Sequence, residues 1–185
     1  MSFIYKGSKE FHCNLECKQC SANTKQGIRC KKTTCKYLPT CYIHTKSKYH
    51  LAIRPSTIPN AGDGLFALKD FKKGEFISDY IGEELTQQDK DNRYGNTQQD
   101  IAPYAIKVSK NKIIDCACTR SIGSYANHKK GNINASISVY MGKAKIKASK
   151  NIKDGQEIFI SYGRDYWNHQ GAKHETRKSK GGINV

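Results

Sequence analysis

The sequence predicts a mainly β domain of short strands, preceded by a small cysteine-rich module. Three observations lead to this prediction. From Leu51 onward, short runs rich in β-branched and aromatic residues follow one another and are punctuated by glycine. Six of the eight cysteines fall between Cys13 and Cys41. The length of 185 residues suits one main core plus an appendage too small to fold by hydrophobic burial alone.

The first 50 residues have the composition of a small basic module with a short linker. They hold ten Lys and Arg against two Asp and Glu, with few aliphatic side chains. The sequence opens without the apolar stretch of a secretory signal and has no run of about 18 apolar residues. We therefore expect an intracellular protein, in the nucleus or cytoplasm, with no membrane association. In a reducing compartment, crowded cysteines favour a metal site over a disulfide framework.

Part of this module has the spacing C-x9-C-x10-C-x2-H, formed by Cys20, Cys30, Cys41 and His44. Zinc prefers four such ligands in a tetrahedron, and a close Cys-x2-His pair supplies two of them from one turn. We therefore predict a structural zinc ion held by these four residues.

The other cysteines leave alternatives open. Cys35 could replace Cys20 as a ligand, the cysteines could be reduced and free of metal, or a second ion could be held with the help of the candidates nearest the N-terminus: His12, Cys13 and Cys17. Cys116 and Cys118 have a C-x-C spacing too tight to make a site unaided, and we interpret them as small buried residues.

The β domain is predicted from seven runs: 64–68, 75–82, 104–108, 112–115, 133–140, 143–148 and 157–163. In the run KAKIKA, three lysines alternate with Ala144, Ile146 and Ala148, the pattern of a half-buried strand. The longest polar interruption extends from Thr86 to Ala102; Thr86 followed by Asp89 could cap one short helix there, but the segment has too few apolar residues to be core.

The chain is thus divided into three parts. Residues 1–50 form the cysteine-rich module and linker, residues 51–163 the β domain, and residues 164–185 a short C-terminal segment with a basic tail. The tail, HETRKSKGGINV, is expected to be disordered because it offers little apolar surface to bury.

Two glycines flank Asp63 just before the strand that begins near Leu65. Gly62 and Gly64 let the backbone take positive φ and approach a ligand, although such a pair alone is mostly a tight turn. Further along, DYIGEE and KDGQEIFISYG each end a β-type run with an aromatic residue and a glycine, which can bring a Tyr hydroxyl to the mouth of a sheet. Between them stands the pair Asn127-His128.

In this order, the segments resemble the successive motifs of the SET-domain protein-lysine methyltransferases. The matching motifs are GxGLFA, FKKGEFISDYIGEE, the Asn-His pair and ASKNIKDGQEIFISYG, spread over roughly Leu51 to Trp167. Four motifs in correct order are far more specific than any one. The Cys-rich segment and short YGRDYW ending are similar to compact SET proteins of large DNA viruses. The resemblance implies a β-clip fold with a knot-like crossing, in which the SYG segment passes beneath the loop of Asn127 and His128.

The resemblance also implies an activity and its residues. A methyl group would pass from S-adenosylmethionine to a lysine amine in a narrow channel, with donor and peptide entering from opposite faces. Asn127 and His128 would hold the amino-acid end of the cofactor, together with the backbone of Gly62, Asp63, Gly64 and Leu65. Tyr162 would stand at the point of methyl transfer, and Tyr80 would line the lysine channel. Further aromatic candidates for the walls or the cofactor are Tyr104, Tyr125, Tyr166 and Trp167.

Three departures from the family pattern stand out. Lys129 follows the Asn-His pair, and Ile133-Asn134 replaces the usual Pro-Asn. The zinc cluster that many relatives place after the last motif is absent, because no cysteine follows Cys118.

Charge suggests the partners. Lys and Arg outnumber Asp and Glu by 32 to 16, giving a net charge of +16, and such a surface attracts polyanions. We expect a protein substrate, with histone tails or nucleosomes leading, and non-specific contact with nucleic acid. An alternative function is a catalytically inactive SET-like zinc protein that binds chromatin or nucleic acid. A third possibility is that Lys178 or Lys180 of the tail enters the protein's own channel.

Overall fold

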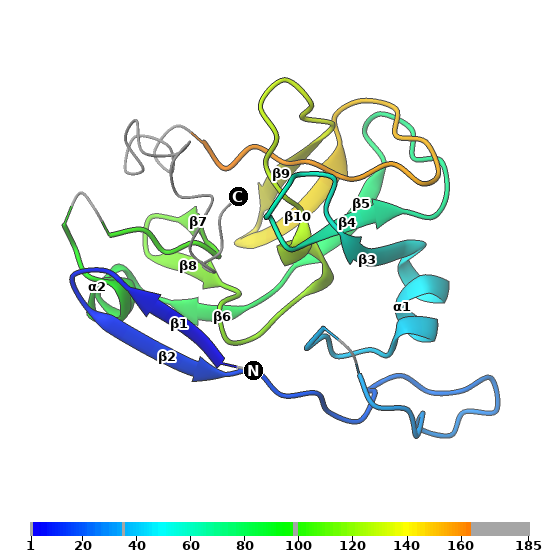
Figure 1. The fold of residues 1–185 in the computed structure, drawn as a ribbon, viewed down its shortest axis with the longest axis horizontal. Helices are drawn as coiled ribbons and strands as arrows, with labels where there is room; N and C mark the ends of the chain where they lie inside the picture. Colours follow the sequence, from blue (N-terminus) through cyan, green and yellow to red (C-terminus); the bar gives the residue numbers. More distant parts are fainter. Residues whose placement is uncertain (1, 35, 98–99, 164–185) are drawn as a thin grey trace.

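A computed structural model describes residues 2–34, 36–97 and 100–163 (Figure 1). The described elements are β1 (Ser2–Lys6), β2 (Glu10–Asn14), α1 (Tyr42–Tyr49), β3 (Leu51–Pro55), β4 (Asp63–Ala67), β5 (Phe76–Tyr80), β6 (Glu83–Leu85), α2 (Gln87–Tyr94), β7 (Ala105–Ser109), β8 (Lys112–Asp115), the 3-10 helix η1 (Ile122–Tyr125), β9 (Ala135–Tyr140) and β10 (Lys143–Ala148). The mainly β prediction is confirmed. The expectations for Cys35, Tyr166, Trp167, Lys178, Lys180 and the tail concern positions outside the described residues.

The strands form small antiparallel sheets. In the described part of the chain they pair as β1-β2, β3-β4, β5-β10-β9 and β6-β8-β7. Their inner faces enclose one main core, whose fully buried members include Leu51, Leu65, Ile77, Ile146 and Ile158. None of the described helices has the length and apolar character needed to cross a bilayer.

β10 is the half-buried strand that its alternation predicts. Ala144, Ile146 and Ala148 are buried, and the three lysines between them point to the other side. The strand lies between β5 and β9. The inner face of this sheet is therefore closed by the core, while its outer face carries Lys143, Lys145 and Lys147.

The predicted strand at 157–163 takes a different form. Instead of joining a sheet, it makes isolated bridges from Glu157 to Phe66 and, in parallel, from Phe159 to Asn127. The N–H of Ile158 donates to the carbonyl of Leu65 (2.7 Å), and the N–H of Ile160 donates to the carbonyl of Asn127 (2.9 Å). The segment cannot belong to one ladder because it passes between two partners, β4 on one side and the Asn127 loop on the other.

The polar interruption folds around a capped helix, as expected. The Thr86 side chain accepts from the N–H of Asp89 and the Asp89 carboxylate accepts from the N–H of Thr86, so both groups of a capping box are present. The expectation that this segment stays out of the core is wrong for Tyr94. Its side chain is 0% exposed, and its hydroxyl donates to Asp115 Oδ2 at 2.6 Å. One aromatic ring thus anchors an otherwise polar helix.

An N-terminal hairpin that the sequence did not predict covers this helix. The β1-β2 hairpin lies beside α2 (Figure 1) and packs the rings of Tyr5 and Phe11 edge-on against Tyr94, with centroids 5.0 and 5.6 Å away. Phe3, Leu15 and Ala117 belong to the same cluster. Cys13 is disulfide-bonded to Cys118. The interpretation of Cys118 as a small buried residue is therefore wrong, since it is partly exposed and covalently paired. Cys116 is fully buried with a free thiol, as expected.

Candidate active site

The Asn127 side chain joins the glycine turn to the crossing segment. It is 4% exposed, and its Nδ2 donates to the backbone carbonyl of Asp63 (3.1 Å) and to Glu157 Oε1 (3.2 Å). The loop that ends η1 places Asn127 beside the start of β4, 64 residues earlier in the chain. The glycine turn and the Asn-His pair are therefore brought together, as the resemblance implied.

Sequence reasoning missed Glu157, which organises the same junction. This buried carboxylate accepts from the hydroxyl of Ser56 (2.7 Å), from the N–H and hydroxyl of Thr57 (2.7 and 2.6 Å), and from Asn127. A Cβ at Gly64 would overlap its Oε1 atom, so this position must be glycine for the segments to approach. The one available signal was an acidic residue opening the apolar run EIFI.

His128 and Tyr162 meet on the far side of the crossing. The N–H of Tyr162 donates to His128 Nδ1 (3.3 Å), and the ring centroids are 5.6 Å apart. A neutral His128 in this arrangement carries its proton on Nε2. The Tyr162 hydroxyl donates to the carbonyl of Ala126 at 3.1 Å. The phenol is thus held against the loop that carries the Asn-His pair.

Two further tyrosines that the sequence analysis assigned to the site are linked by a hydrogen bond. The buried Tyr80 hydroxyl donates to the backbone carbonyl of Tyr104 at 2.9 Å. Burial raises the pKa of Tyr80 well above its usual value, and the nearby Cys116 and Tyr162 add to the rise. Burial likewise raises the pKa of Tyr104. These phenols therefore stay neutral at physiological pH and offer hydroxyl groups rather than phenolates.

A loop of the cysteine-rich segment reaches the same region. The Tyr125 hydroxyl donates to the carbonyl of Lys36, and Lys36 Nζ forms an ion pair with Asp63 at 2.7 Å. Burial raises the pKa of Tyr125. Residue 36 is thereby linked to both the glycine turn and η1, an arrangement that sequence reasoning missed.

Two of the departures from the family motif have structural explanations. Lys129 Nζ lies 5.7 Å from the centroid of the Phe159 ring, so its charge is placed over the crossing segment. Asn134 clamps the same segment: its Nδ2 donates to the carbonyl of Glu157 (2.9 Å) and its Oδ1 accepts from the N–H of Phe159 (2.8 Å). The asparagine therefore holds the crossing without a preceding proline.

The predicted zinc ligands converge. One ligand atom from each of Cys20, Cys30, Cys41 and His44 lies within 4.8 Å of all the others. α1 starts directly after Cys41, which places Cys41 and His44 on its first turn, with the Cys41 sulfur 3.4 Å from His44 Nδ1. Three thiols and an imidazole at this spacing fit tetrahedral zinc. The cluster of four is the arrangement that the sequence spacing predicts.

Two thiols of the cluster shift in opposite directions, since burial raises the pKa of Cys41 whereas that of Cys20 is lowered. Burial raises the pKa of the Cys20 thiol, but hydrogen bonds from the backbone of Cys41 and Ala22 outweigh it and lower the value to about 7. The described residues bring together no second group of this kind. His12 is paired with Glu10, Cys13 is in the disulfide, and Cys17 is exposed, so the two-ion alternative finds no support there.

This fold and crossing define a SET-type domain. Residues 62–163 match the family model described as SET domain, which is more than half of the chain. The protein therefore belongs to the SET domain family.

Its relatives in sequence are histone-lysine methyltransferases. The chain is 33% identical over 124 residues to histone-lysine N-methyltransferase EZH2 of Chaetomium thermophilum, covering 61% of this chain and 8% of that protein. It is 27% identical over 186 residues to histone-lysine N-methyltransferase mes-4 of Caenorhabditis elegans, covering 83% of this chain and 20% of that protein. The chain thus spans a fifth or less of these relatives.

Solved structures with a similar fold include chains of polycomb repressive complex 2. An active polycomb repressive complex 2 in the stimulated state matches with a TM-score of 0.54 and 27% identity, over 61% of this chain and 15% of that one. The Chaetomium complex in an autoinhibited conformation bound to S-adenosylmethionine matches with a TM-score of 0.53 and 27% identity, over 70% and 17%.

Proposed function

We propose that this protein is an S-adenosylmethionine-dependent protein-lysine N-methyltransferase. The observation that carries the proposal is the crossing that brings Asn127 and His128 against Tyr162, 34 residues apart in sequence. In this proposal Asn127, His128 and the Gly62–Leu65 backbone hold the cofactor, and Tyr104 and Trp167 contribute to its walls. The described residues fit such a group, because a Cβ at Gly62 would meet no atom within 4 Å and the turn therefore borders open space.

The bound cofactor would supply an electrophilic methyl group, and the chain's own residues would prepare the amine. A lysine with a pKa near ~10.4 is almost entirely protonated at pH 7, and only its neutral form has a lone pair. A channel lined by the rings of Tyr80 and Tyr162 would exclude water and so disfavour the ammonium form. The Tyr162 hydroxyl and the Ala126 carbonyl orient the amine for in-line attack, which contributes several kcal/mol when geometry is tight. No dedicated general base is required.

The deciding experiment is transfer of labelled methyl from S-adenosylmethionine to core histones. Wild type should transfer label, and Tyr162→Phe should lower the rate by about 100-fold or more, because the orienting hydroxyl is lost. Tyr140→Phe is the matched control, since Tyr140 is 72% exposed at the β9-β10 turn and should leave the rate unchanged. Absence of transfer by wild type both to any histone and to its own tail, with binding to chromatin retained, would favour the inactive alternative.

Histones are the proposed substrate class. The two relatives reported above are named as histone-lysine methyltransferases, which supports the proposal at the level of family. The net charge of +16 favours acidic assemblies such as nucleosomes. An intracellular, chromatin-associated location follows from this substrate. Methylation of Lys178 or Lys180 in the chain's own tail remains a hypothesis that intact-mass measurement after incubation with cofactor tests.

The proposal includes zinc and nucleic acid as partners. Structural zinc held by Cys20, Cys30, Cys41 and His44 would stabilise a module spanning residues 1–50, beside a SET domain at 51–163 and a C-terminal segment at 164–185. Non-specific nucleic acid would bind the outer face of β10, where Lys143, Lys145 and Lys147 form no ion pair within the described part of the chain. The likeness to viral SET proteins stays a prediction.

A further inference from the structure

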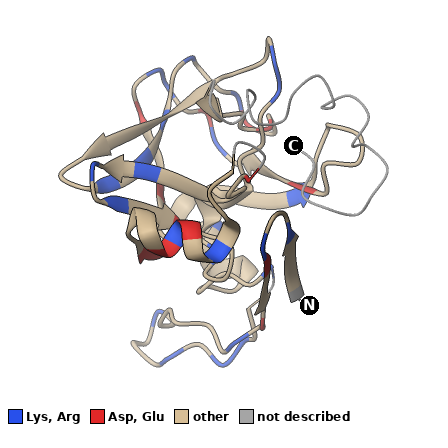
Figure 2. Ribbon diagram, turned by 90° about the vertical axis from the view of Figure 1, so that its left-hand side faces the viewer, with Lys and Arg blue, Asp and Glu red and all other residues tan. Residues whose placement is uncertain are grey.

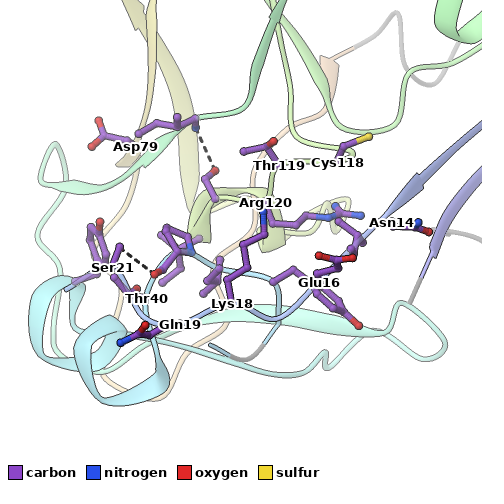
Figure 3. Close-up of a pocket in the computed structure, with 18 of the residues that line it drawn as sticks. Asn14, Glu16, Lys18, Gln19, Ser21, Thr40, Asp79, Cys118, Thr119 and Arg120 are labelled. Carbon is purple, nitrogen blue, oxygen red and sulfur yellow. Dashed lines mark hydrogen bonds between the residues drawn. The ribbon is translucent and has the colours of Figure 1, made fainter. Parts of the chain in front are cut away.

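A cavity of about 550 Å³ lies between the cysteine-rich segment and the SET domain, outside the proposed active site. One wall comes from residues 14–16, 18–19, 21 and 37–40, and the other from Asp79, Ile81 and residues 118–122. Figure 3 shows Asp79 and Thr119 on the side opposite Gln19 and Thr40. Its volume is in the range of small-molecule and peptide sites. Leu15, Leu38 and Ile122 give it apolar lining.

Arg120 is the exceptional residue of this cavity. It lines the space although it is only 8% exposed, and no carboxylate in the described part of the chain lies within ion-pair distance of it. Arg93 shows the usual arrangement for an arginine in this protein, since it pairs with Glu83 at 2.6 Å and Asp115 at 2.8 Å. A buried cation without a counter-charge is costly. An anion entering the cavity would remove that cost.

The orientation of Arg120 favours a planar anion. Its guanidinium carbon lies 3.5 Å from the centroid of the Tyr104 ring, so one flat face is stacked on the aromatic ring. The edge of a guanidinium carries five N–H donors, and the side-chain hydrogen bond between Arg120 and Tyr104 uses only part of that edge, so donors remain for a ligand. The backbone beside it is fixed, because Cys118 is bonded to Cys13 and the Ser121 hydroxyl accepts from the N–H of Ile81 at 3.1 Å.

The other charged side chains that line the cavity indicate which kind of anion it can bind. Besides Arg120, the lining has two cations, Lys18 and Arg29, and two carboxylates, Glu16 and Asp79. The surplus is one positive charge, which matches a monoanion. Glu16 and Asp79 would repel the second charge of a phosphate dianion, so a carboxylate fits better than a phosphate.

We propose that this cavity binds a carboxylate attached to an apolar body, with Arg120 as its anchor. Two sources present this chemistry: the acidic side chain of a peptide flanked by apolar residues, and a free aliphatic monocarboxylate. The inference does not require methyl transfer: none of the proposed active-site residues lines the cavity, although Arg120 stacks on Tyr104 of the proposed cofactor wall.

The test is NMR titration of the full-length, zinc-loaded chain with capped Ala-Leu-Glu-Leu-Ala peptide and, separately, with hexanoate. At least one probe should shift the amide signals of residues 118–122 and of Lys18, and which probe binds tighter identifies the source. The Ala-Leu-Gln-Leu-Ala peptide and hexanamide are neutral controls that should not bind. Inorganic phosphate should bind more weakly than the better carboxylate.

Variants then test the anchor. Arg120→Gln should weaken carboxylate binding by at least about tenfold, the loss expected for a charge-assisted bidentate pair. Arg54→Gln is the matched control, because Arg54 also lies over an aromatic ring but is exposed and distant from the cavity. The proposal fails if neither carboxylate shifts these signals at millimolar concentration, if the neutral probes bind equally, or if phosphate binds tighter. Should Arg120→Gln not fold, the charged and neutral probes on wild type still decide.

Discussion

At the scale of single residues, Glu157 is the group on which the site's geometry depends. It accepts four hydrogen bonds from three residues that precede it by 30 to 101 positions. A carboxylate can accept all four because it carries no donor, whereas a glutamine has one acceptor oxygen and an NH2 group. The position therefore requires Glu rather than merely a polar side chain.

Glu157→Gln should accordingly destabilise the protein by about 1–3 kcal/mol, because two of the four donors would lose their acceptor. It should also weaken S-adenosylmethionine binding, since Asn127 would lose one of its two contacts. Urea unfolding and calorimetry measure the two effects. Glu10→Gln, an exposed control, should change neither. Wild-type stability in Glu157→Gln would show that the carboxylate is not required.

Residues differ in how far the sequence could predict them. Asn127, His128 and Tyr162 were singled out because a family motif names residue types at a spacing, and the structure places them together. Their functional roles stay predictions. Glu157 was not singled out, and Asn134 was noted only as part of the Ile133-Asn134 pair that replaces Pro-Asn, because the contacts of both arise only when the chain crosses itself and no local pattern encodes that crossing.

At the scale of elements, Asp100 connects the N-terminal hairpin to the loop after α2. Its carboxylate accepts from the N–H of Ser8 (2.8 Å) and from the N–H and hydroxyl of Thr97 (3.0 and 2.7 Å). The hydroxyls of Ser8 and Tyr5 also donate to it. Burial alone would raise the pKa of Asp100, but the bonds from Ser8 and Thr97 outweigh it and hold the pKa well below its usual range.

This predicts an acid-sensitive hairpin. Because the pKa of Asp100 is depressed in the folded state, the stabilisation is present above the unfolded value of about 3.9 and is lost as the pH falls from there toward the folded value. Asp100→Asn should cost about 1–3 kcal/mol at pH 7 and flatten the decline in stability below pH ~4. Unfolding curves from pH 7 to pH 2 provide the measurement, with exposed Asp154→Asn as control. Parallel pH profiles for wild type and Asp100→Asn would contradict the assignment.

The cysteine-rich segment and the glycine turn should respond together to metal removal. Chelation should unfold the region from Cys20 to His44, because a module of this size lacks a core of its own. Loss of the Lys36–Asp63 pair and of the Tyr125–Lys36 bond would then weaken S-adenosylmethionine binding. Lys36→Ala with zinc present should weaken it by at most about fivefold, because a partly exposed ion pair contributes ~1 kcal/mol or less. Circular dichroism measures the unfolding, and calorimetry measures the affinity for S-adenosylmethionine. If chelation leaves that affinity unchanged, the zinc cluster does not support the cofactor site.

Helices and strands were easiest to predict where one local sequence pattern determines the secondary structure. KAKIKA forms the strand that its alternation indicates, and Thr86 with Asp89 caps the helix that follows. Two segments departed from prediction for tertiary reasons. The run 157–163 divides its hydrogen bonds between β4 and the Asn127 loop, and polar α2 is anchored by the single ring of Tyr94.

At the scale of the whole molecule, positive charge is widely distributed, and the N-terminal 50 residues contact the rest at several points. Figure 2 shows Lys and Arg positions spread over most elements. The segment before residue 50 contributes a hairpin on α2, a disulfide to residue 118 and the Lys36 contacts beside the active site. The outward lysines of β10 stay accessible in the described structure: Lys143 and Lys147 are exposed and Lys145 is partly exposed, so this side of β10 is available to a polyanion.

The outer face of β10 is predicted to bind duplex DNA through its three lysines. Lys143, Lys145 and Lys147 are successive outward residues of one strand, spaced by ~6.8 Å, and Ser136 and Ser138 beside them offer hydroxyl donors. If each lysine neutralises one phosphate of duplex DNA, replacing all three by Gln should reduce the magnitude of the slope of log affinity against log salt by about 2.7. Fluorescence anisotropy with a labelled duplex measures this slope. The control replaces exposed Lys25, Lys31 and Lys32 by Gln, an identical change in net charge on the cysteine-rich segment, and should leave the slope close to wild type. Equal losses in both triple variants would mean that nucleic acid responds to total charge and not to this face.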